Sequence, residues 1–154
     1  MGLPIRSRLP HTTPQWVASG SWYFITINCA PPGKNQLCRA EVGDAVISTL
    51  AHNHRKLAWH CRVALLMPDH LHAIIAFPPE PGMATVIKNW KHFNATHFRV
   101  EWQRDFFDHR LRNDQEEQEK TSYILMNPLR KGLCERAEDW RWVYRPSDRP
   151  PPSP

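Results

Sequence analysis

Two histidines separated by a single residue, His70 and His72, are the clearest chemical feature of the sequence. They stand at the start of a predicted strand over residues 71–77, and successive side chains of a strand point to opposite faces of its sheet. The apolar row of this strand consists of Leu71, Ala73, Ile75 and Phe77. Both imidazoles therefore share the other face, where two such rings can bind one divalent metal ion. Two polar residues on a half-exposed strand remain the alternative interpretation of this spacing.

Tyr123 is the second candidate. It lies on a predicted helix over residues 114–126, and Asn127 follows four residues later on the same helix face. Pro128 is expected to end or kink this helix. If the helix packs on the histidine-bearing sheet face, the two imidazoles and the Asn127 carboxamide provide ligands suited to Mg²⁺ or Mn²⁺ acting on a phosphodiester. A half-buried helical aromatic is the alternative for Tyr123.

A zinc-dependent hydrolase is a weaker interpretation of the histidine pair. It requires a third strong ligand and a general-base carboxylate, and strand alternation is expected to direct the neighbouring Asp69 to the other face. The four cysteines form no C-x-x-C pair, so a structural zinc site is not expected either.

Hydrophobic periodicity and turn residues predict the elements that must position these side chains. Strands are predicted over residues 21–29, 58–67, 71–77 and 106–109, and helices over 39–56, 83–100 and 114–126. Pro68 and Asp69 are expected to form the tight turn of a β-hairpin between the second and third strands. The order β-α-β-β-α-β is that of an α+β, ferredoxin-like sheet. The last helix is then left to pack on the sheet face that the first two helices do not cover.

Length and composition indicate one globular domain. The chain has 154 residues, a net charge of +5 and 41% hydrophobic residues, which argues against wholesale disorder. It contains neither a membrane-length apolar run nor a secretory signal, so we expect no membrane association and a cytoplasmic location. We expect a basic flexible arm over residues 1–20 with Arg6 and Arg8, a catalytic domain over 21–144, and a proline-rich tail over 145–154.

Basic side chains between residues 84 and 112 are candidates for contacts with nucleic-acid phosphates. Arg104, Arg110 and Arg112 are expected near the proposed site, whereas Lys88 and Lys91 share one face of the second predicted helix. His109 could orient a phosphate or a metal ligand. An ordinary surface or structural role is the alternative for each of these residues, and also for Arg6 and Arg8.

Several segments together resemble a known family. Residues 67–72 (MPDHLH) resemble the His-hydrophobic-His signature, termed HUH, of single-tyrosine transposases. Residues 102–112 (WQRDFFDHRLR) and 123–133 (YILMNPLRKGL) resemble two blocks of the REP-associated tyrosine transposases, and residues 22–26 (WYFIT) resemble their first strand. The similarity extends from about residue 22 to residue 142.

This resemblance implies a metal-dependent DNA strand transferase. Tyr123 is then the nucleophile that attacks single-stranded DNA and leaves a 5′-phosphotyrosine link with a free 3′-hydroxyl. His70, His72 and Asn127 then hold the Mg²⁺ or Mn²⁺, and no nucleotide cofactor is needed. The implied substrates are palindromic REP hairpins with a flanking tetranucleotide, handled by a monomer or a homodimer. A module with an RRM-like sheet that binds hairpins without cutting them is the alternative function.

Overall fold

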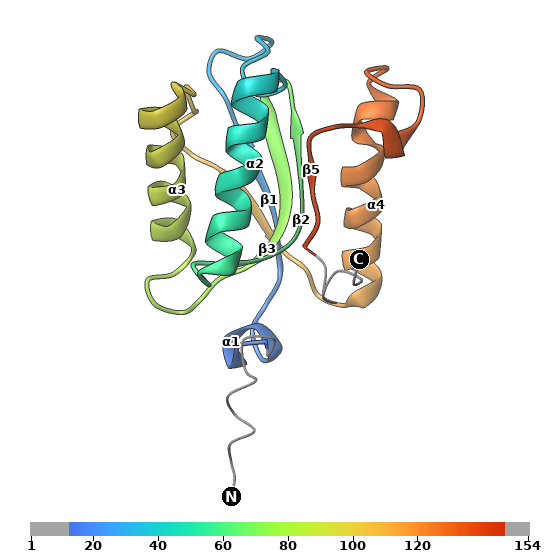
Figure 1. Cartoon of the computed structure of the whole chain (residues 1–154). Helices are drawn as coiled ribbons and strands as arrows, with labels where there is room; N and C mark the ends of the chain where they lie inside the picture. Colours follow the sequence, from blue (N-terminus) through green and yellow to red (C-terminus); the bar gives the residue numbers. More distant parts are fainter. Residues whose placement is uncertain (1–12, 147–154) are drawn as a thin grey trace, which may run out of the picture.

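The computed structural model describes residues 13–146 of the protein (Figure 1). Arg6 and Arg8, most of the expected N-terminal arm, and all but the first two residues of the expected tail lie outside the described residues. The elements are, in chain order, α1 (Gln15–Ala18), β1 (Tyr23–Asn28), α2 (Ala40–Arg55), β2 (His60–Met67), β3 (His70–Ala76), α3 (Met83–Phe98), β4 (Phe107–Arg110), α4 (Asp114–Arg130), the 3-10 turn η2 (Ala137–Asp139) and β5 (Val143–Tyr144).

Five antiparallel strands form one sheet in the order β4-β1-β3-β2-β5. The first four strands, together with α2 and α3, make the predicted ferredoxin-like β-α-β-β-α-β unit. Met67 and His70 are paired at the closed end of the β2–β3 hairpin, so Pro68 and Asp69 form its two-residue turn as expected. On the other side of β3, the strand pairing sets Thr26 of β1 opposite His72.

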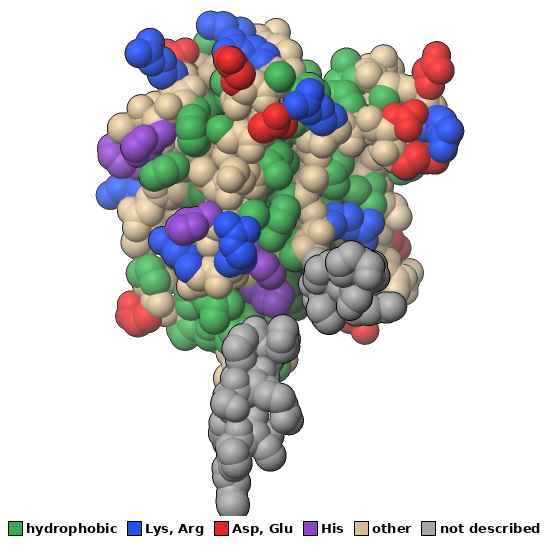
Figure 2. Space-filling model, in the orientation of Figure 1, with side chains coloured by type: hydrophobic (Ala, Val, Ile, Leu, Met, Phe, Trp, Pro, Cys, Tyr) green, Lys and Arg blue, Asp and Glu red, His purple; other side chains and the backbone are tan. Residues whose placement is uncertain are grey.

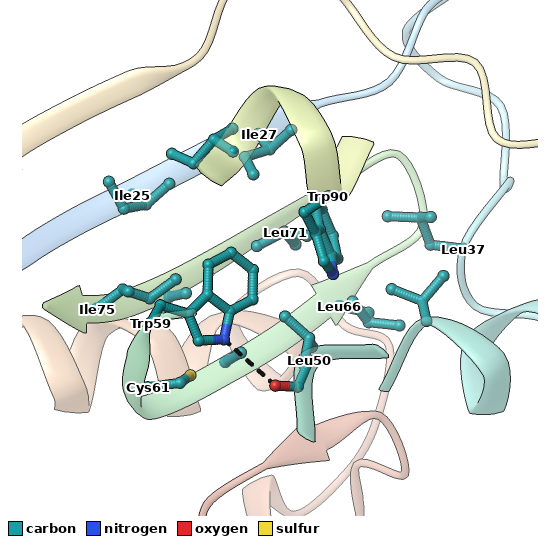
Figure 3. Close-up of a cluster of buried hydrophobic side chains, with 14 of the residues drawn as sticks. Ile25, Ile27, Leu37, Leu50, Trp59, Cys61, Leu66, Leu71, Ile75 and Trp90 are labelled. Atoms are coloured by element: carbon teal, nitrogen blue, oxygen red, sulfur yellow. Dashed lines mark hydrogen bonds between the residues drawn. The ribbon is translucent and has the colours of Figure 1, made fainter. Parts of the chain in front are cut away.

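The two faces of the sheet are covered by different helices, with α2 and α3 on one side and α4 on the other (Figure 1). The core under α2 and α3 receives Leu71, Ala73 and Ile75 from β3, which confirms the predicted apolar row. Figure 3 shows this core, in which the fully buried Trp59 donates its indole N–H to the Leu50 carbonyl oxygen at 3.3 Å. Helix α4, which is not part of the β-α-β-β-α-β order, therefore packs on the opposite face, as expected.

A smaller core joins α4 to the sheet. It consists of Phe24, Val63, Leu65, Met67, Ile74, Leu111 and Ile124, and only the last of these belongs to α4. Asn127 and Pro128 are the other buried residues of this helix. Ile124 is thus the fully buried apolar side chain that α4 contributes to this core, and Leu125 packs against it with partial burial.

The predicted end of the last helix at residue 126 was wrong, because α4 continues through Pro128 to Arg130. Proline removes one backbone N–H, which in this helix is the donor for the carbonyl four residues earlier. The last turn is nevertheless closed by backbone bonds from Lys131 to Asn127 at 3.0 Å and from Leu133 to Pro128 at 2.9 Å. Asn127 consequently keeps its helical position one turn after Tyr123.

Three short elements were not predicted, namely α1, the 3-10 turn η2 and β5. The single helical turn α1 lies within the expected arm, and its Val17 is 6% exposed. Strand β5 has two residues, too few for a period-2 pattern, and it forms only through its pairing with Ala64 and Leu65 of β2. None of the helices between residues 13 and 146 is long and apolar enough to cross a membrane.

Candidate active site

The histidine pair lies on the α4 side of β3. His72 is 6% exposed and stacks on Phe24, with ring centroids 5.3 Å apart. His70 is more exposed, and its ring centroid lies 4.8 Å from that of His72. The alternation along β3 therefore places both imidazoles on one face, as the sequence predicts.

Each imidazole is oriented by a hydrogen bond at Nδ1. Thr26 Oγ1 lies 2.9 Å from His72 Nδ1, and Asp69 Oδ1 lies 2.8 Å from His70 Nδ1. With the proton of each ring on Nδ1, Nε2 carries the lone pair that can bind a metal ion. The expectation that Asp69 is directed to the other face was wrong, because Asp69 belongs to the turn and lies outside the strand, where the period of two does not apply.

Burial sets the charge of His72. Desolvation is the main cause that lowers its pKa to about 3, and the positive charges of His70, Arg130 and Lys120 lower it further. His72 is therefore neutral at physiological pH. Neutral imidazole is the form that offers a lone pair to a metal ion.

Tyr123 projects from α4 beside this pair. Its side chain is 44% exposed, and its ring centroid lies 5.6 Å from that of His72 and 6.1 Å from that of Phe24. Asn127, one turn later, is 3% exposed. Helix α4 thus brings an accessible phenol to the histidine face and carries a buried amide one turn later.

The donor set fits a divalent cation. Two Nε2 atoms and one amide oxygen are nitrogen and oxygen ligands of the kind that Mg²⁺ and Mn²⁺ accept. Within residues 13–146, no group of three His, Cys, Asp or Glu side chains could hold a metal ion. The Asn127 amide oxygen is the candidate third ligand of another type.

Two cations that the sequence analysis missed flank Tyr123. Arg130 lies with its guanidinium carbon 4.6 Å from the centroid of the Tyr123 ring and donates to the Tyr123 carbonyl oxygen at 3.0 Å. Lys120 Nζ lies 5.8 Å from the same centroid. The signal was present in the sequence, because positions 120, 123, 127 and 130 follow the spacing of one helix face.

The predicted phosphate-binding residues are not gathered at this site. Lys88 and Lys91 lie on α3, on the opposite side of the sheet from α4 (Figure 1). Lys91 Nζ donates to the carbonyl oxygens of Gln103 at 2.7 Å and Arg104 at 2.9 Å, and burial lowers the pKa of this amine. Its ammonium group therefore holds the loop before β4. Figure 2 shows Lys and Arg side chains spread over the visible face.

His109 and Arg112 are joined to α4 through Glu116. The carboxylate of Glu116 lies 2.7 Å from His109 Nε2, accepts the Arg112 backbone N–H at 2.8 Å and lies 3.6 Å from the Arg112 guanidinium. The hydrogen bonds from His109 and Arg112 lower the pKa of Glu116 to about 2. In contrast, Lys88, Arg104 and Arg110 are exposed and form no ion pair with any described residue.

A ferredoxin-like sheet with a histidine pair on one face and a tyrosine helix over it is the arrangement that the HUH resemblance implies. The sequence is 23% identical over 133 residues to the REP-associated tyrosine transposase of Escherichia coli (strain K12), covering 81% of this chain and 76% of that protein. It is 25% identical over 140 residues to a putative REP-associated tyrosine transposase of Haemophilus influenzae, covering 79% of this chain and 77% of the relative.

A solved structure of a REP-associated tyrosine transposase bound to a REP hairpin has the same fold, with a TM-score of 0.71 at 20% identity. The match covers 80% of this chain and 76% of the solved one. No protein-family model matches the chain. The two sequence relatives and this fold confirm the resemblance to the REP-associated tyrosine transposases, and they support a transposase-like role.

Proposed function

We propose that this protein cleaves and rejoins single-stranded DNA at hairpin sequences, with Tyr123 as the nucleophile. The observation that carries the proposal is an accessible phenol 5.6 Å, ring centroid to ring centroid, from a buried neutral histidine on the same sheet face. Binding of a hairpin requires neither the histidine pair nor the exposed tyrosine. Their convergence therefore favours an enzyme over a module that only binds.

In the proposed step, Tyr123 Oη attacks a backbone phosphorus and the bond from phosphorus to the 3′ oxygen breaks. The DNA 5′ phosphate becomes esterified to the tyrosine, and the departing 3′ oxygen takes up a proton and becomes a hydroxyl. The phenol proton leaves to solvent, which the exposure of the ring permits. Because the phosphodiester bond is exchanged and not hydrolysed, attack by a 3′-hydroxyl rejoins a strand without a nucleotide cofactor.

His70, His72 and Asn127 are the residues that we propose hold Mg²⁺ or Mn²⁺. Such an ion, when bound, polarises the scissile phosphate and neutralises the charge that develops on it. The protein's own contribution is to keep Nε2 of both imidazoles directed to the site through Thr26 and Asp69. Arg130 and Lys120 add positive charge beside Tyr123, where the DNA phosphate must lie.

A DNA hairpin is the proposed partner, and the relative solved with a REP hairpin supports this choice. Arg104, Arg110 and Lys88 are the predicted phosphate contacts whose charges remain unpaired within the described part of the chain. Arg112 and His109 interact with Glu116, so we propose that they stabilise the junction between β4 and α4.

The test is a denaturing gel with a labelled single-stranded hairpin and Mn²⁺. We expect a protein–DNA band that resists SDS in the wild type and in Tyr144→Phe, and that is absent in Tyr123→Phe. Tyr144 is a matched control, because its ring packs on the core under α2 and α3. Hairpin binding without any covalent band, over a range of hairpins, would show that the protein is a binding module.

A further inference from the structure

The carboxylate of Asp69 makes two different hydrogen bonds, one from each oxygen. Oδ1 lies 2.8 Å from Nδ1 of His70, whereas Oδ2 accepts the backbone N–H of Gly33 at 2.7 Å. Gly33 lies in the loop between β1 and α2, at a φ of +86° that side chains rarely adopt. One side chain therefore connects a proposed metal ligand to a loop 36 residues earlier in the sequence.

The backbone around Asp69 is fixed independently of this carboxylate. The Asp69 carbonyl oxygen accepts the Cys29 N–H at 2.8 Å, and the Pro68 carbonyl accepts the N–H groups of Gln36 at 2.9 Å and Leu37 at 3.1 Å. These bonds hold the turn against the loop whatever side chain occupies position 69. The carboxylate is consequently free to act on the imidazole ring, and its removal is not expected to unfold the turn.

We propose that Asp69 is a positioning residue that fixes the tautomer and the ring orientation of His70. A carboxylate is only an acceptor, so its contact requires the proton of a neutral His70 to reside on Nδ1. Nε2 then carries the lone pair and faces the site. This role rests on the proposed function, because it concerns the same metal site. Asp69 is also a residue that strand alternation would direct away from that site.

The two-oxygen arrangement makes Asp69→Asn informative. A carboxamide offers one acceptor oxygen and one donor NH₂, so it can accept a hydrogen bond from His70 or from Gly33 but not from both. If its oxygen stays on Gly33, the NH₂ faces His70 Nδ1 and favours the tautomer with the proton on Nε2. If its oxygen turns to His70, the Gly33 N–H loses its acceptor. Asp69→Ala removes both bonds.

The primary measurement is the tautomer of His70 in metal-free protein labelled with ¹⁵N-histidine, read from long-range ¹H–¹⁵N spectra at pH 7.5. We expect the Nδ1–H form in the wild type and a clear gain of the Nε2–H form in Asp69→Ala. Asp108→Asn is the control, because this carboxylate is exposed on β4. A wild-type His70 in the Nε2–H form, or an unchanged tautomer in Asp69→Ala, would overturn the proposal.

The second measurement is Mn²⁺ affinity, followed by the loss of the free-ion EPR signal. Loss of an outer-shell partner typically weakens metal binding by about 10-fold to 100-fold. We expect a loss of at least about tenfold in Asp69→Ala and wild-type affinity in Asp108→Asn. If the tautomer responds to Asp69 but the wild type binds no Mn²⁺, the positioning role stands and the metal in the proposed function fails. Equal Mn²⁺ affinity in the wild type and Asp69→Ala would overturn the role of Asp69 at the metal site.

Discussion

The attachment of α4 to the sheet offers the sharpest test of how this fold positions Tyr123. Ile124, the residue after the proposed nucleophile, is fully buried and is the only α4 member of the smaller core. Deletion of a buried branched side chain to alanine costs about 2–5 kcal/mol, and Ile to Val costs about 0.5–1.5 kcal/mol. We therefore expect Ile124→Ala to lower the free energy of unfolding by about 3 kcal/mol and Ile124→Val by about 1 kcal/mol.

The region in which amide exchange accelerates is more informative than the size of the loss in the free energy of unfolding. Ile87 of α3 is equally buried, but it shares its core with Val86 and Trp90 of the same helix. Ile87→Ala should therefore lower global stability by a similar amount while α4 stays docked. In Ile124→Ala, amide hydrogen exchange should accelerate selectively along α4, because a helix with one fully buried apolar anchor opens locally before the sheet unfolds.

The assay combines chemical denaturation with hydrogen exchange resolved by residue, on the wild type and the three variants. A loss of less than about 1 kcal/mol in Ile124→Ala would contradict the anchoring role of this side chain. Exchange along α4 that is no faster in Ile124→Ala than in Ile87→Ala would contradict it as well. Either result would mean that the helix is held mainly by contacts other than the smaller core.

Three further predictions concern side chains around the site. Thr26→Val should weaken Mn²⁺ binding about tenfold while Thr26→Ser retains it, as measured by EPR titration, and equal affinities would contradict an orienting role for the hydroxyl. Glu116 has a pKa of about 2 in the folded protein against an ordinary value of 4.5, so its stabilising contribution is present above pH 4.5 and is lost as the pH falls toward 2. Glu116→Gln should therefore lose less free energy of unfolding than the wild type over that pH range, and equal losses in the two proteins would exclude this effect. Lys91→Met should lower the free energy of unfolding by about 1–3 kcal/mol, because the Lys91 amine donates to two carbonyl oxygens. Lys88→Met should change it by less than about 0.5 kcal/mol in the same denaturation assay, and similar losses in the two variants would show that Lys91 is an ordinary surface charge.

Local patterns were enough to predict the main elements of the fold. The alternation along residues 71–77 separated Leu71, Ala73 and Ile75 from the histidines, and the structure assigns the two sets to opposite faces. The turn at Pro68 and Asp69 followed from residue type alone. The end of α4 was predicted too early. The proline in the last turn removes one hydrogen bond, but the helix continues past it and the following turn is closed by other backbone hydrogen bonds.

The sequence indicated which residues are candidates for the site, but it did not indicate the contacts that surround them. Histidine spacing on a strand and the four-residue interval from Tyr123 to Asn127 are properties of single elements, so the sequence reveals them. The cations beside Tyr123 were overlooked although they share its helix face. The roles of Lys91 and Glu116 could not be predicted, because their partners are backbone groups and side chains from other elements.

Which side chains share a face could be predicted from the sequence, because helical and strand periodicities are local geometry. The sequence also specified the order of elements and therefore which helix remained for the open side of the sheet. The packing of separate elements sets how close the phenol and the imidazoles lie. It also desolvates His72, which is therefore neutral, and lets Asp69 connect His70 to a distant loop. Distances and desolvation depend on how separate elements pack together, and no periodicity within one element encodes them.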